Sequence, residues 1–337
     1  MTTVITKRLG YLATAERLLA PLGPVEYCAD QQPETVRQHL PSATVLMATK
    51  GVTVDGDTLD AAPNLRIVAA PTAGFEWIDV DAATARGIPV IANLGAAADA
   101  VAEFTLGVVL ALTRRIAEAD RDLHQGRDWD ATRAEYARAD QRIGVQLSGS
   151  TVGVVGLGHI GLKVAEKLAV LQPARMLGFD PVISPERAKT AGVTLCPDLR
   201  SLAEQADVLT LHVPLTPATT GLVDAGLLAA MKPTAFLVNC ARGKVVSEDA
   251  LIDALRDQRL AGAALDVYED EPLPADSPLR SLGHVILTTH IAGVTAQSDE
   301  NRAREIAHRV LACADGTQPD GLVNPEVWDR RRPFSDQ

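Results

Sequence analysis

Cysteine and aromatic side chains are scarce in this chain of 337 residues, which has four cysteines and only 4% Phe, Trp and Tyr. The cysteines are far apart in the sequence and form no C-x-x-C pair. We therefore expect neither a disulfide framework nor a zinc or other metal site, and a reducing cytoplasm fits this usage. The four positions are Cys28, Cys196, Cys240 and Cys313.

Long apolar runs and excess positive charge are also missing. No uncharged stretch is long enough to span a membrane, and the first residues, MTTVITKRLG, lack the apolar centre of a secretion signal. The formal net charge is −11, which repels nucleic acid and anionic membranes. We expect neither as a partner. An anionic substrate would need a local cationic pocket.

Short β-rich runs alternate along the chain with longer amphipathic runs, and the length suits two domains. This pattern predicts an α/β protein with parallel sheets. The first series has strands at Thr2–Thr6, Thr44–Ala48, Arg66–Ala70 and Pro89–Ile91, and helices at Glu34–Leu40 and Asp81–Arg86. The second has strands at Thr151–Val155, Arg175–Phe179, Val208–Leu211, Ala235–Asn239, Gly262–Leu265 and Val285–Leu287, then a helix from Ala296 to Cys313.

A long helix is predicted between the two series, roughly from Asp99 to Leu123. Its first half is apolar nearly all round, so it is either a core helix or a connector or subunit interface. The polar stretch Gly126–Ser150 has little pattern and is interpreted as an excursion, one that reaches a partner subunit if the chain is a dimer. The final residues, DRRRPFSDQ, are expected to be loose.

A glycine motif, GLGHIG, follows the strand that begins at Thr151 and opens an apolar helix. In this context Gly156 permits a tight turn, Gly158 lets the backbone approach a pyrophosphate, and Gly161 allows close packing of helix and strand. Asp180 ends the next strand, at the distance expected for the acid that binds the ribose hydroxyls, and its charge favours NAD over NADP. The alternative is a glycine turn without a cofactor.

Three further segments follow strands, where ligand sites gather in open α/β sheets: Val238–Gly243 (VNCARG), Leu265–Pro272 (LDVYEDEP) and Thr289–Gly293 (THIAG). Together with TAGFEWIDVDAATARGIPV, AVAE, GLGHIG and HVPLTPATTGLV, they closely resemble the D-isomer specific 2-hydroxyacid dehydrogenase family over nearly the whole chain. The resemblance implies two Rossmann-like, doubly wound parallel-sheet domains. One is a flavodoxin-like substrate domain at 1–98 and 294–337, and the other an NAD-binding domain at 99–293.

The resemblance also implies the chemistry, which is hydride transfer between nicotinamide and C2 of a small 2-oxo or D-2-hydroxy acid. Arg242 would grip the substrate carboxylate through its planar guanidinium. His290 would act as general acid in reduction and as general base in oxidation, and Glu271 would pair with it and hold the ring. Taken singly, each of the three residues has an ordinary structural interpretation, and the joint motif favours the catalytic one.

Ligand contacts follow from the same resemblance. The NAD site would comprise Gly156, Gly158, His159, Ile160, Gly161, Asp180, Val213, Pro214, Thr219, Cys240, Ala241, Arg242, Asp266 and His290. The substrate would meet Lys50, Ala73, Gly74, Arg242 and His290, with Lys50 equally well a solvated surface lysine. Asp266 would lie near the nicotinamide carboxamide, and Cys240 is not interpreted as a nucleophile.

Several positions depart from the usual family pattern, and most lie on the substrate side. They are Thr72, Glu76, Trp77, Ala92, Leu94, Ser247 and Thr289. Glyoxylate, hydroxypyruvate, lactate-type, phosphoglycerate and sulfolactate-type substrates therefore remain open. Glu271 disfavours formate oxidation, since formate dehydrogenases carry glutamine there. A homodimer is expected from the resemblance. The rival function is that of a non-enzymatic NAD(H)-sensing regulator of the same fold.

Overall fold

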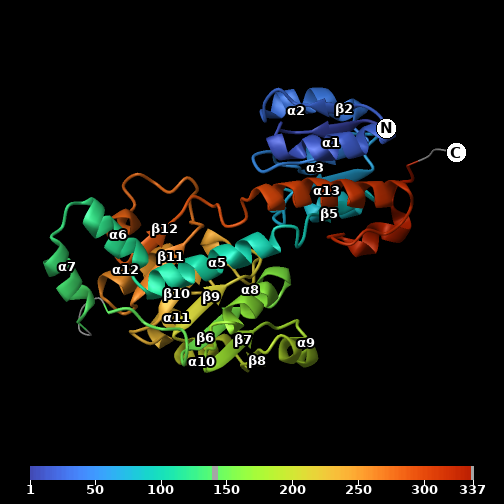
Figure 1. Ribbon diagram of the computed structural model, residues 1–337. Coiled ribbons are helices and arrows are strands. Elements are labelled where there is room, and N and C mark those ends of the chain that lie inside the picture. The colour runs from blue at the N-terminus through green and yellow to red at the C-terminus, as the bar shows by residue number, and fades with distance from the viewer. Residues whose placement is uncertain (139–142, 335–337) are drawn as a thin grey trace. The chain divides into compact units, whose positions relative to one another are not determined.

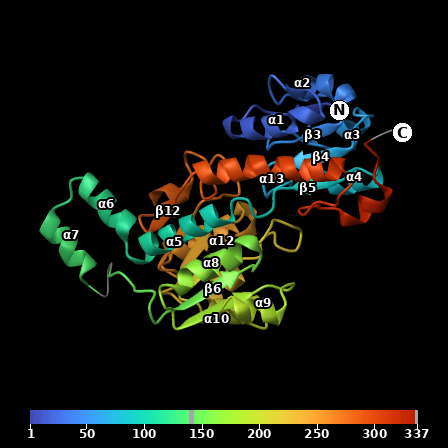
Figure 2. The same ribbon diagram turned by 45° about the vertical axis from the view of Figure 1, so that its right-hand side comes forward.

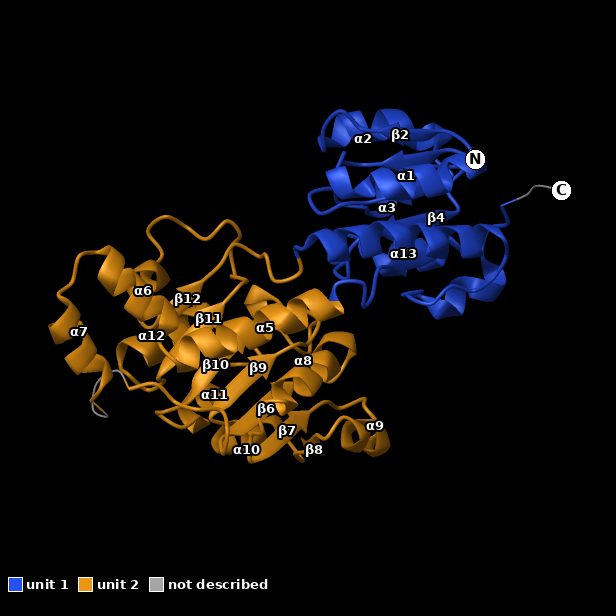
Figure 3. Cartoon of the chain, in the orientation of Figure 1, with its two compact units in different colours: residues 1–97, 294–337 blue, residues 98–293 orange. Residues whose placement is uncertain are grey.

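The computed structural model describes residues 1–138 and 143–334, and the chain divides into two compact units (Figure 3). Unit 1 comprises Met1–Ala97 and Val294–Gln337, and unit 2 comprises Ala98–Gly293. Ala98, which the sequence analysis grouped with the first domain, begins a helix of unit 2. Among the described residues, no helix combines the length and apolarity needed to cross a membrane.

Unit 2 is built on a seven-stranded parallel sheet with the order β12-β11-β10-β9-β6-β7-β8 (Figure 1). Chain order reverses between β6 and β9, as in the Rossmann fold, and ligands bind such sheets outside the carboxyl ends of the strands. The strands are β6 (Thr151–Val155), β7 (Arg175–Phe179), β8 (Thr194–Leu195), β9 (Val208–Leu211), β10 (Phe236–Asn239), β11 (Gly262–Leu265) and β12 (Val285–Leu287).

Helices cover both faces of this sheet, and the strands are almost wholly buried. Val152 and Val154 pack into one apolar cluster with α5 and α8, and Leu209 and Leu211 into another with α10, α11 and α12. Two buried faces explain the nearly continuous apolar runs of these strands. The helices are α5 (Ala98–Thr113), α6 (Ile116–His124), α7 (Trp129–Tyr136), α8 (His159–Ala169), α9 (Pro185–Thr190), α10 (Leu199–Gln205), α11 (Ala225–Ala230) and α12 (Glu248–Arg256).

Unit 1 holds a five-stranded parallel sheet with the order β2-β1-β3-β4-β5, the doubly wound order of flavodoxin-like folds. Its strands are β1 (Thr3–Ile5), β2 (Val25–Tyr27), β3 (Val45–Met47), β4 (Ile67–Ala70) and β5 (Val90–Ala92). Helices α1 (Ala13–Leu19), α2 (Pro33–His39), α3 (Gly56–Asp60), α4 (Val80–Ala85) and the returning α13 (Ala296–Ala314) surround it. The sequence analysis missed β2, α1 and α3 of unit 1 and β8 of unit 2, and it gave no bounds for α9 to α12.

The prediction of one long helix over Asp99–Leu123 is wrong in one respect, because the segment forms two helices, α5 and α6. Arg115 breaks it with a left-handed φ of 58°, which few residues other than glycine adopt. The Arg115 guanidinium forms an ion pair with Glu118 (2.8 Å) and lies over the Phe236 ring, 5.5 Å from its centroid. These contacts hold the break, and α6 and α7 then extend away from the sheet of unit 2 (Figures 1 and 2).

The segment Gly126–Ser150, predicted to have little pattern, contains helix α7. The Asp128 side chain caps its start by accepting a bond from the Ala131 N–H. Arg127 fixes α7 to α6 through Asp122 (3.0 Å) and Glu135 (2.5 Å). A helix whose stability comes from such ion pairs leaves little apolar periodicity in the sequence.

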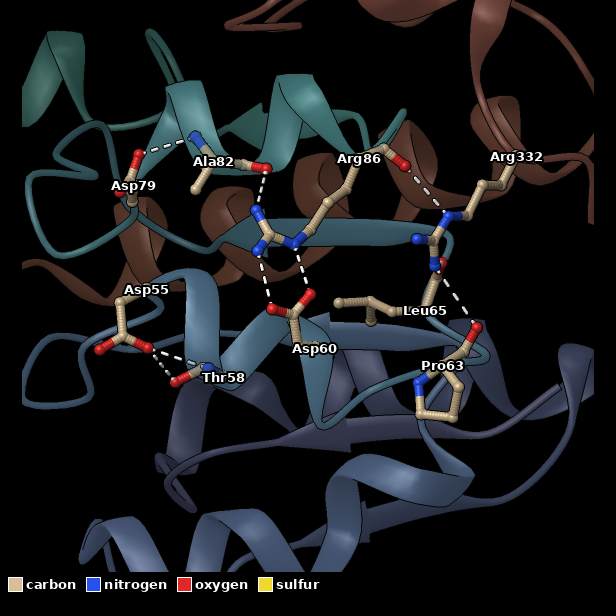
Figure 4. A network of polar contacts seen from close by, with 9 residues as sticks. All are labelled: Asp55, Thr58, Asp60, Pro63, Leu65, Asp79, Ala82, Arg86 and Arg332. Carbon is tan, nitrogen blue, oxygen red and sulfur yellow. Dashed lines mark hydrogen bonds and ion pairs between the residues drawn. The ribbon is translucent and has the colours of Figure 1, made fainter.

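The C-terminal tail is anchored as far as Phe334, which corrects the expectation that it is loose; residues 335–337 lie outside the described part. Trp328 stacks under the Arg331 guanidinium, 3.8 Å from its ring centroid. Arg332 donates to the Arg86 carbonyl (3.0 Å), and Arg86 in turn forms a two-pronged bond with Asp60 (2.7 and 2.9 Å; Figure 4). Arginine-rich tails resemble solvated segments in sequence, whereas here the guanidiniums cap backbone carbonyls.

Candidate active site

The predicted catalytic side chains come from three neighbouring strands of unit 2. Arg242 follows β10, Glu271 follows β11 and His290 follows β12, and these strands are adjacent in the sheet. The strands are parallel, so their carboxyl ends meet at one edge and the three loops lie side by side there. A site at this edge is what the three sequence segments predicted.

Glu271 and His290 form a direct pair, with Oε2 of the carboxylate 2.9 Å from Nδ1 of the ring. The His290 side chain is 43% exposed and that of Glu271 22%. A charge-assisted bond to Nδ1 fixes the ring and leaves Nε2 as the atom that can exchange a proton with a ligand. This geometry suits a general acid–base group.

The loop that carries His290 is held in an unusual conformation by Asp266. His290 has a φ of 58°, in the left-handed region. The buried Asp266 carboxylate accepts bonds from the Thr288 hydroxyl (2.6 Å) and from the N–H groups of Ile291 (2.8 Å) and Ala292 (2.9 Å). It therefore anchors the loop on both sides of His290. Its predicted place beside the nicotinamide carboxamide remains a prediction.

Residues that bear on the cofactor follow β6 and β7. Gly156 turns with a φ of 85°, and a Cβ on Gly161 would lie 1.9 Å from the Gly156 carbonyl oxygen. A Cβ on Gly158 would meet nothing within 4 Å, so the backbone there faces open space. The N-cap residue of α8 is Gly158, which has no side chain to cap the helix, and uncapped N–H groups at a helix start are suited to a pyrophosphate. The loop fits a dinucleotide.

Asp180 closes the other side of this loop. Its Oδ2 accepts the Leu157 N–H (2.7 Å), and its Oδ1 accepts the N–H groups of Val182 (2.8 Å) and Ile183 (3.1 Å). The carboxylate is thus held at the end of β7, where a ribose would meet it. Further along, the Thr219 hydroxyl donates to the Pro214 carbonyl (2.6 Å), so Thr219 shapes the loop that begins at Val213.

Burial sets the protonation of two other groups near this edge. It raises the pKa of the Cys240 thiol to about 12, so the thiol stays protonated, in keeping with the prediction that it is not a nucleophile. Burial also lowers the pKa of His212 to about 3. The His212 Nε2 lies 2.9 Å from the Thr210 hydroxyl, and its Nδ1 is buried with no partner among the described residues. His212 is therefore a neutral structural group.

The predicted substrate contacts of unit 1 follow β3 and β4. Lys50 is exposed, Ala73 is exposed and Gly74 is buried. The Thr72 hydroxyl donates to the Gly74 carbonyl (3.0 Å) and shapes this turn. Trp77 donates from its indole to the Ala48 carbonyl (3.2 Å), which ties the turn to the end of β3. Thr72 and Trp77, which depart from the usual family pattern, thus have structural roles.

Sequence reasoning missed the residues that hold the loops of Arg242 and His290. Tyr268 is buried and donates its hydroxyl to the Thr288 carbonyl (2.7 Å). The Asn239 side chain accepts the Ala241 N–H and donates to the Arg242 carbonyl, so it holds the two residues that follow Cys240. A polar residue at the end of an apolar strand is the signal that identifies Asn239 in the sequence, whereas Tyr268 resembles an ordinary core aromatic.

Comparison with known proteins adds to this geometry. The family model for the NAD-binding domain of D-isomer specific 2-hydroxyacid dehydrogenases matches residues 106–292. A glyoxylate reductase from Thermofilum pendens is 41% identical over 281 residues, covering 81% of this chain and 79% of the reductase. A D-3-phosphoglycerate dehydrogenase from Methanocaldococcus jannaschii is 36% identical over 92% of this chain and 57% of its own length. The structure of the TT0316 protein from Thermus thermophilus is 31% identical, with a TM-score of 0.82 over 96% and 100% of the two chains.

Fold and site together define a two-domain α/β protein with a glycine loop that fits a dinucleotide and a half-exposed histidine paired with a carboxylate. The family model and the 41% identical relative show that the chain belongs to the D-isomer specific 2-hydroxyacid dehydrogenase family. It is an NAD-dependent oxidoreductase that interconverts a 2-oxo acid and a D-2-hydroxy acid. The comparisons give no support to the alternative of a non-enzymatic regulator.

Proposed function

We propose that the chain reduces a small 2-oxo acid such as glyoxylate, with His290, Glu271 and Arg242 as its catalytic residues. The observation that carries the proposal is the 2.9 Å bond between His290 Nδ1 and Glu271 Oε2. Support for a small substrate comes from the glyoxylate reductase, of which this chain covers 79%, against 57% of the phosphoglycerate dehydrogenase.

The proposed roles follow from the chemistry of each group. NADH supplies the hydride when it is bound. Arg242 holds the substrate carboxylate through two N–H groups of its guanidinium. His290 donates its Nε2 proton to the carbonyl oxygen, and Glu271 keeps the ring oriented throughout. Ala73 and Gly74 offer backbone N–H groups to the carboxylate. Lys50 is the group of unit 1 proposed to meet any second charge on a substrate.

The cofactor contacts are proposed as the sequence predicted them. Gly156, Gly158 and Gly161 admit the pyrophosphate to the start of α8, where His159 and Ile160 provide N–H groups. Asp180 binds the ribose hydroxyls. The adenosine end meets the loop of Val213, Pro214 and Thr219, and the nicotinamide meets Cys240, Ala241, Arg242, Asp266 and His290.

A substrate panel with a histidine variant tests the proposal. Purified chain is mixed with glyoxylate, hydroxypyruvate, pyruvate, phenylpyruvate, oxaloacetate or sulfopyruvate, with NADH or NADPH, and the loss of nicotinamide absorbance is followed. We expect glyoxylate with NADH to give the highest kcat/KM. His290→Ala should lower kcat by about 10²–10⁴-fold, the usual contribution of general acid–base catalysis. His308→Ala, in α13 of unit 1 and exposed, is the matched control.

Two outcomes would contradict this. Turnover of His290→Ala at the parent rate would remove the histidine from the mechanism. A highest kcat/KM with oxaloacetate or sulfopyruvate would show that the chain selects a second anionic group, and the small-substrate proposal would be wrong.

We infer further that the enzyme is a cytoplasmic homodimer. All four cysteines are free, as a reducing compartment requires. Helices α6 and α7 extend from unit 2 and expose Ile116 (56%), Leu123 (43%) and Trp129 (65%). Exposed apolar side chains gathered on one projection are typical of a surface that a partner covers. A second copy of the chain is the proposed partner.

A further inference from the structure

The loop that carries Arg242 is fixed by a single buried amide. Asn239, the last residue of β10, has only 1% of its surface exposed. Its Oδ1 accepts the Ala241 N–H at 3.0 Å, and its Nδ2 donates to the Arg242 carbonyl at 3.0 Å. One side chain therefore bonds the backbone at two successive residues and folds the chain into a tight turn just before Arg242.

The residues around this turn are held as closely. The Asn239 carbonyl accepts the Asp266 N–H at 3.0 Å, so the ends of β10 and β11 are joined. Beyond Arg242, a Cβ on Gly243 would lie 1.8 Å from the Tyr268 carbonyl oxygen, so only glycine fits there. Arg242 itself has extended backbone angles, φ −143° and ψ 143°. The backbone of Arg242 is thus fixed on one side by the Asn239 side chain and on the other by the close packing of Gly243 against Tyr268.

Asparagine is the residue type that this turn requires. Its carboxamide accepts from one backbone N–H and donates to one backbone C=O at the same time. An aspartate has the same shape but no donor, so an oxygen would face the Arg242 carbonyl oxygen. Serine is able to keep the bond to the Ala241 N–H and is too short to keep both. Of these three side chains, only the amide of asparagine forms both the bond to the Ala241 N–H and the bond to the Arg242 carbonyl.

We propose that Asn239 is a positioning residue, which sets the placement of the Arg242 guanidinium through the turn at 239–242. It acts through Arg242 and does not touch the substrate. The inference rests on the proposed role of Arg242 in binding the substrate carboxylate. It does not depend on which 2-oxo acid is the best substrate.

The test uses Asn239→Asp with a matched buried control. Asn324 in unit 1 is also 1% exposed; its Oδ1 accepts the Val90 N–H (2.8 Å) and its Nδ2 donates to the Ile88 carbonyl (3.1 Å). Asn324→Asp thus makes the same chemical change in the other unit of the chain. We measure kcat and KM for the preferred 2-oxo acid, the Kd of NADH, and the Kd of oxalate, a carboxylate that is not reduced.

Only Asn239→Asp should affect carboxylate binding. We expect kcat/KM to fall by roughly 100-fold, as misplacement of a substrate-holding group by about 1 Å does, with weaker oxalate binding. The Kd of NADH should rise by a smaller factor than the Kd of oxalate, because the glycine loop that is proposed to hold the pyrophosphate is untouched and only the nicotinamide end meets the turn. Asn324→Asp should keep the kinetic constants of the wild type, whatever its effect on Tm.

A double variant separates positioning from a general structural effect. If Asn239 acts through Arg242, then Asn239→Asp should change kcat/KM far less in an Arg242→Lys background than in the wild type, because coupled residues are not additive. Full additivity, or wild-type kinetics of Asn239→Asp, would overturn the proposal. If Asn239→Asp does not fold, Asn239→Ser carries the same prediction. A wild-type chain that reduces none of the 2-oxo acids would instead overturn the proposed function.

Discussion

His212 shows how burial alone decides what a histidine does. Its ring lies at the end of β9 with Nε2 against the Thr210 hydroxyl, and burial lowers its pKa to about 3. His290 lies at the same edge of the same sheet, is 43% exposed and has a carboxylate partner. His212 and His290 both follow strands but differ in chemistry, because His212 is buried away from water and His290 is paired with the Glu271 carboxylate.

The buried ring predicts a pH dependence of stability. Above about pH 6.5 both the folded and the unfolded chain carry a neutral His212, and it contributes no pH dependence. As the pH falls from 6.5 toward 3, the unfolded chain binds a proton that the folded chain does not, so the free energy of unfolding decreases. The slope is at most about 1.4 kcal/mol per pH unit from this residue.

Urea unfolding at pH 7 and at pH 5 measures this effect. His212→Gln should reduce the loss of stability between the two pH values by about 1–2 kcal/mol, since glutamine does not titrate. His308→Gln, at an exposed position, should lose as much stability as the wild type. An equal loss in the wild type and in His212→Gln would show that His212 is protonated in the folded chain.

At the scale of elements, the junction of β6 and α8 separates two functions of glycine. Gly161 is required by the fold, because a Cβ there would lie 1.9 Å from the Gly156 carbonyl oxygen. The fold does not require a glycine at 158, because φ there is −78° and an added Cβ would meet nothing within 4 Å. We attribute the glycine at 158 to the cofactor, whose pyrophosphate needs close access to the backbone.

Replacing each glycine by alanine distinguishes the two. Gly161→Ala should lower the free energy of unfolding by about 1–3 kcal/mol, the usual cost of overpacking. Gly158→Ala should keep the Tm of the wild type and raise the Kd of NADH by at least about tenfold, or about 1.4 kcal/mol. Thermal unfolding and NADH fluorescence titration give the two quantities. Unchanged NADH affinity in Gly158→Ala would mean that the pyrophosphate binds elsewhere.

At the scale of the whole molecule, the projection formed by α6 and α7 is the feature that a single chain does not explain. Trp129, the first residue of α7, exposes 65% of its surface, and polar contacts of Arg127 and Tyr136 hold α7 to α6. Such an arm buries little of its own apolar surface. The proposed dimer would cover it.

Trp129→Glu tests the dimer directly. A charge at the centre of an apolar interface should weaken association by at least about tenfold in Kd, because the carboxylate would be buried without a partner. Val170→Glu is the control, since Val170 is 79% exposed in unit 2 but lies at the end of α8. Light scattering over a range of concentrations should show dissociation of the first variant only. A wild-type chain that is monomeric at all concentrations would end the proposal.

The sequence by itself determined every strand except β2 and β8 to within about a residue, together with the glycine loop and the class of chemistry. Strands β6, β7, β9, β11 and β12 have the predicted bounds. Buried parallel strands are short apolar runs between turn residues, and this local pattern survives in any context. The resemblance to the family also implied the pairing of Glu271 with His290, and the 2.9 Å contact confirms it.

Only the tertiary structure decided the break at Arg115, helix α7, the anchored tail and the supports of the catalytic loops. Three of these features depend on a partner that is remote in the chain: Phe236 for Arg115, the Arg86 carbonyl for Arg332, and Asp266 for the loop of His290. Helix α7 depends on the ion pairs of Arg127 with Asp122 and Glu135. Hydrogen bonds and ion pairs of this kind leave no periodicity, because one residue at each end is enough. Local pattern determines which segments become strands, and contacts across the fold determine how a charged or polar side chain is used.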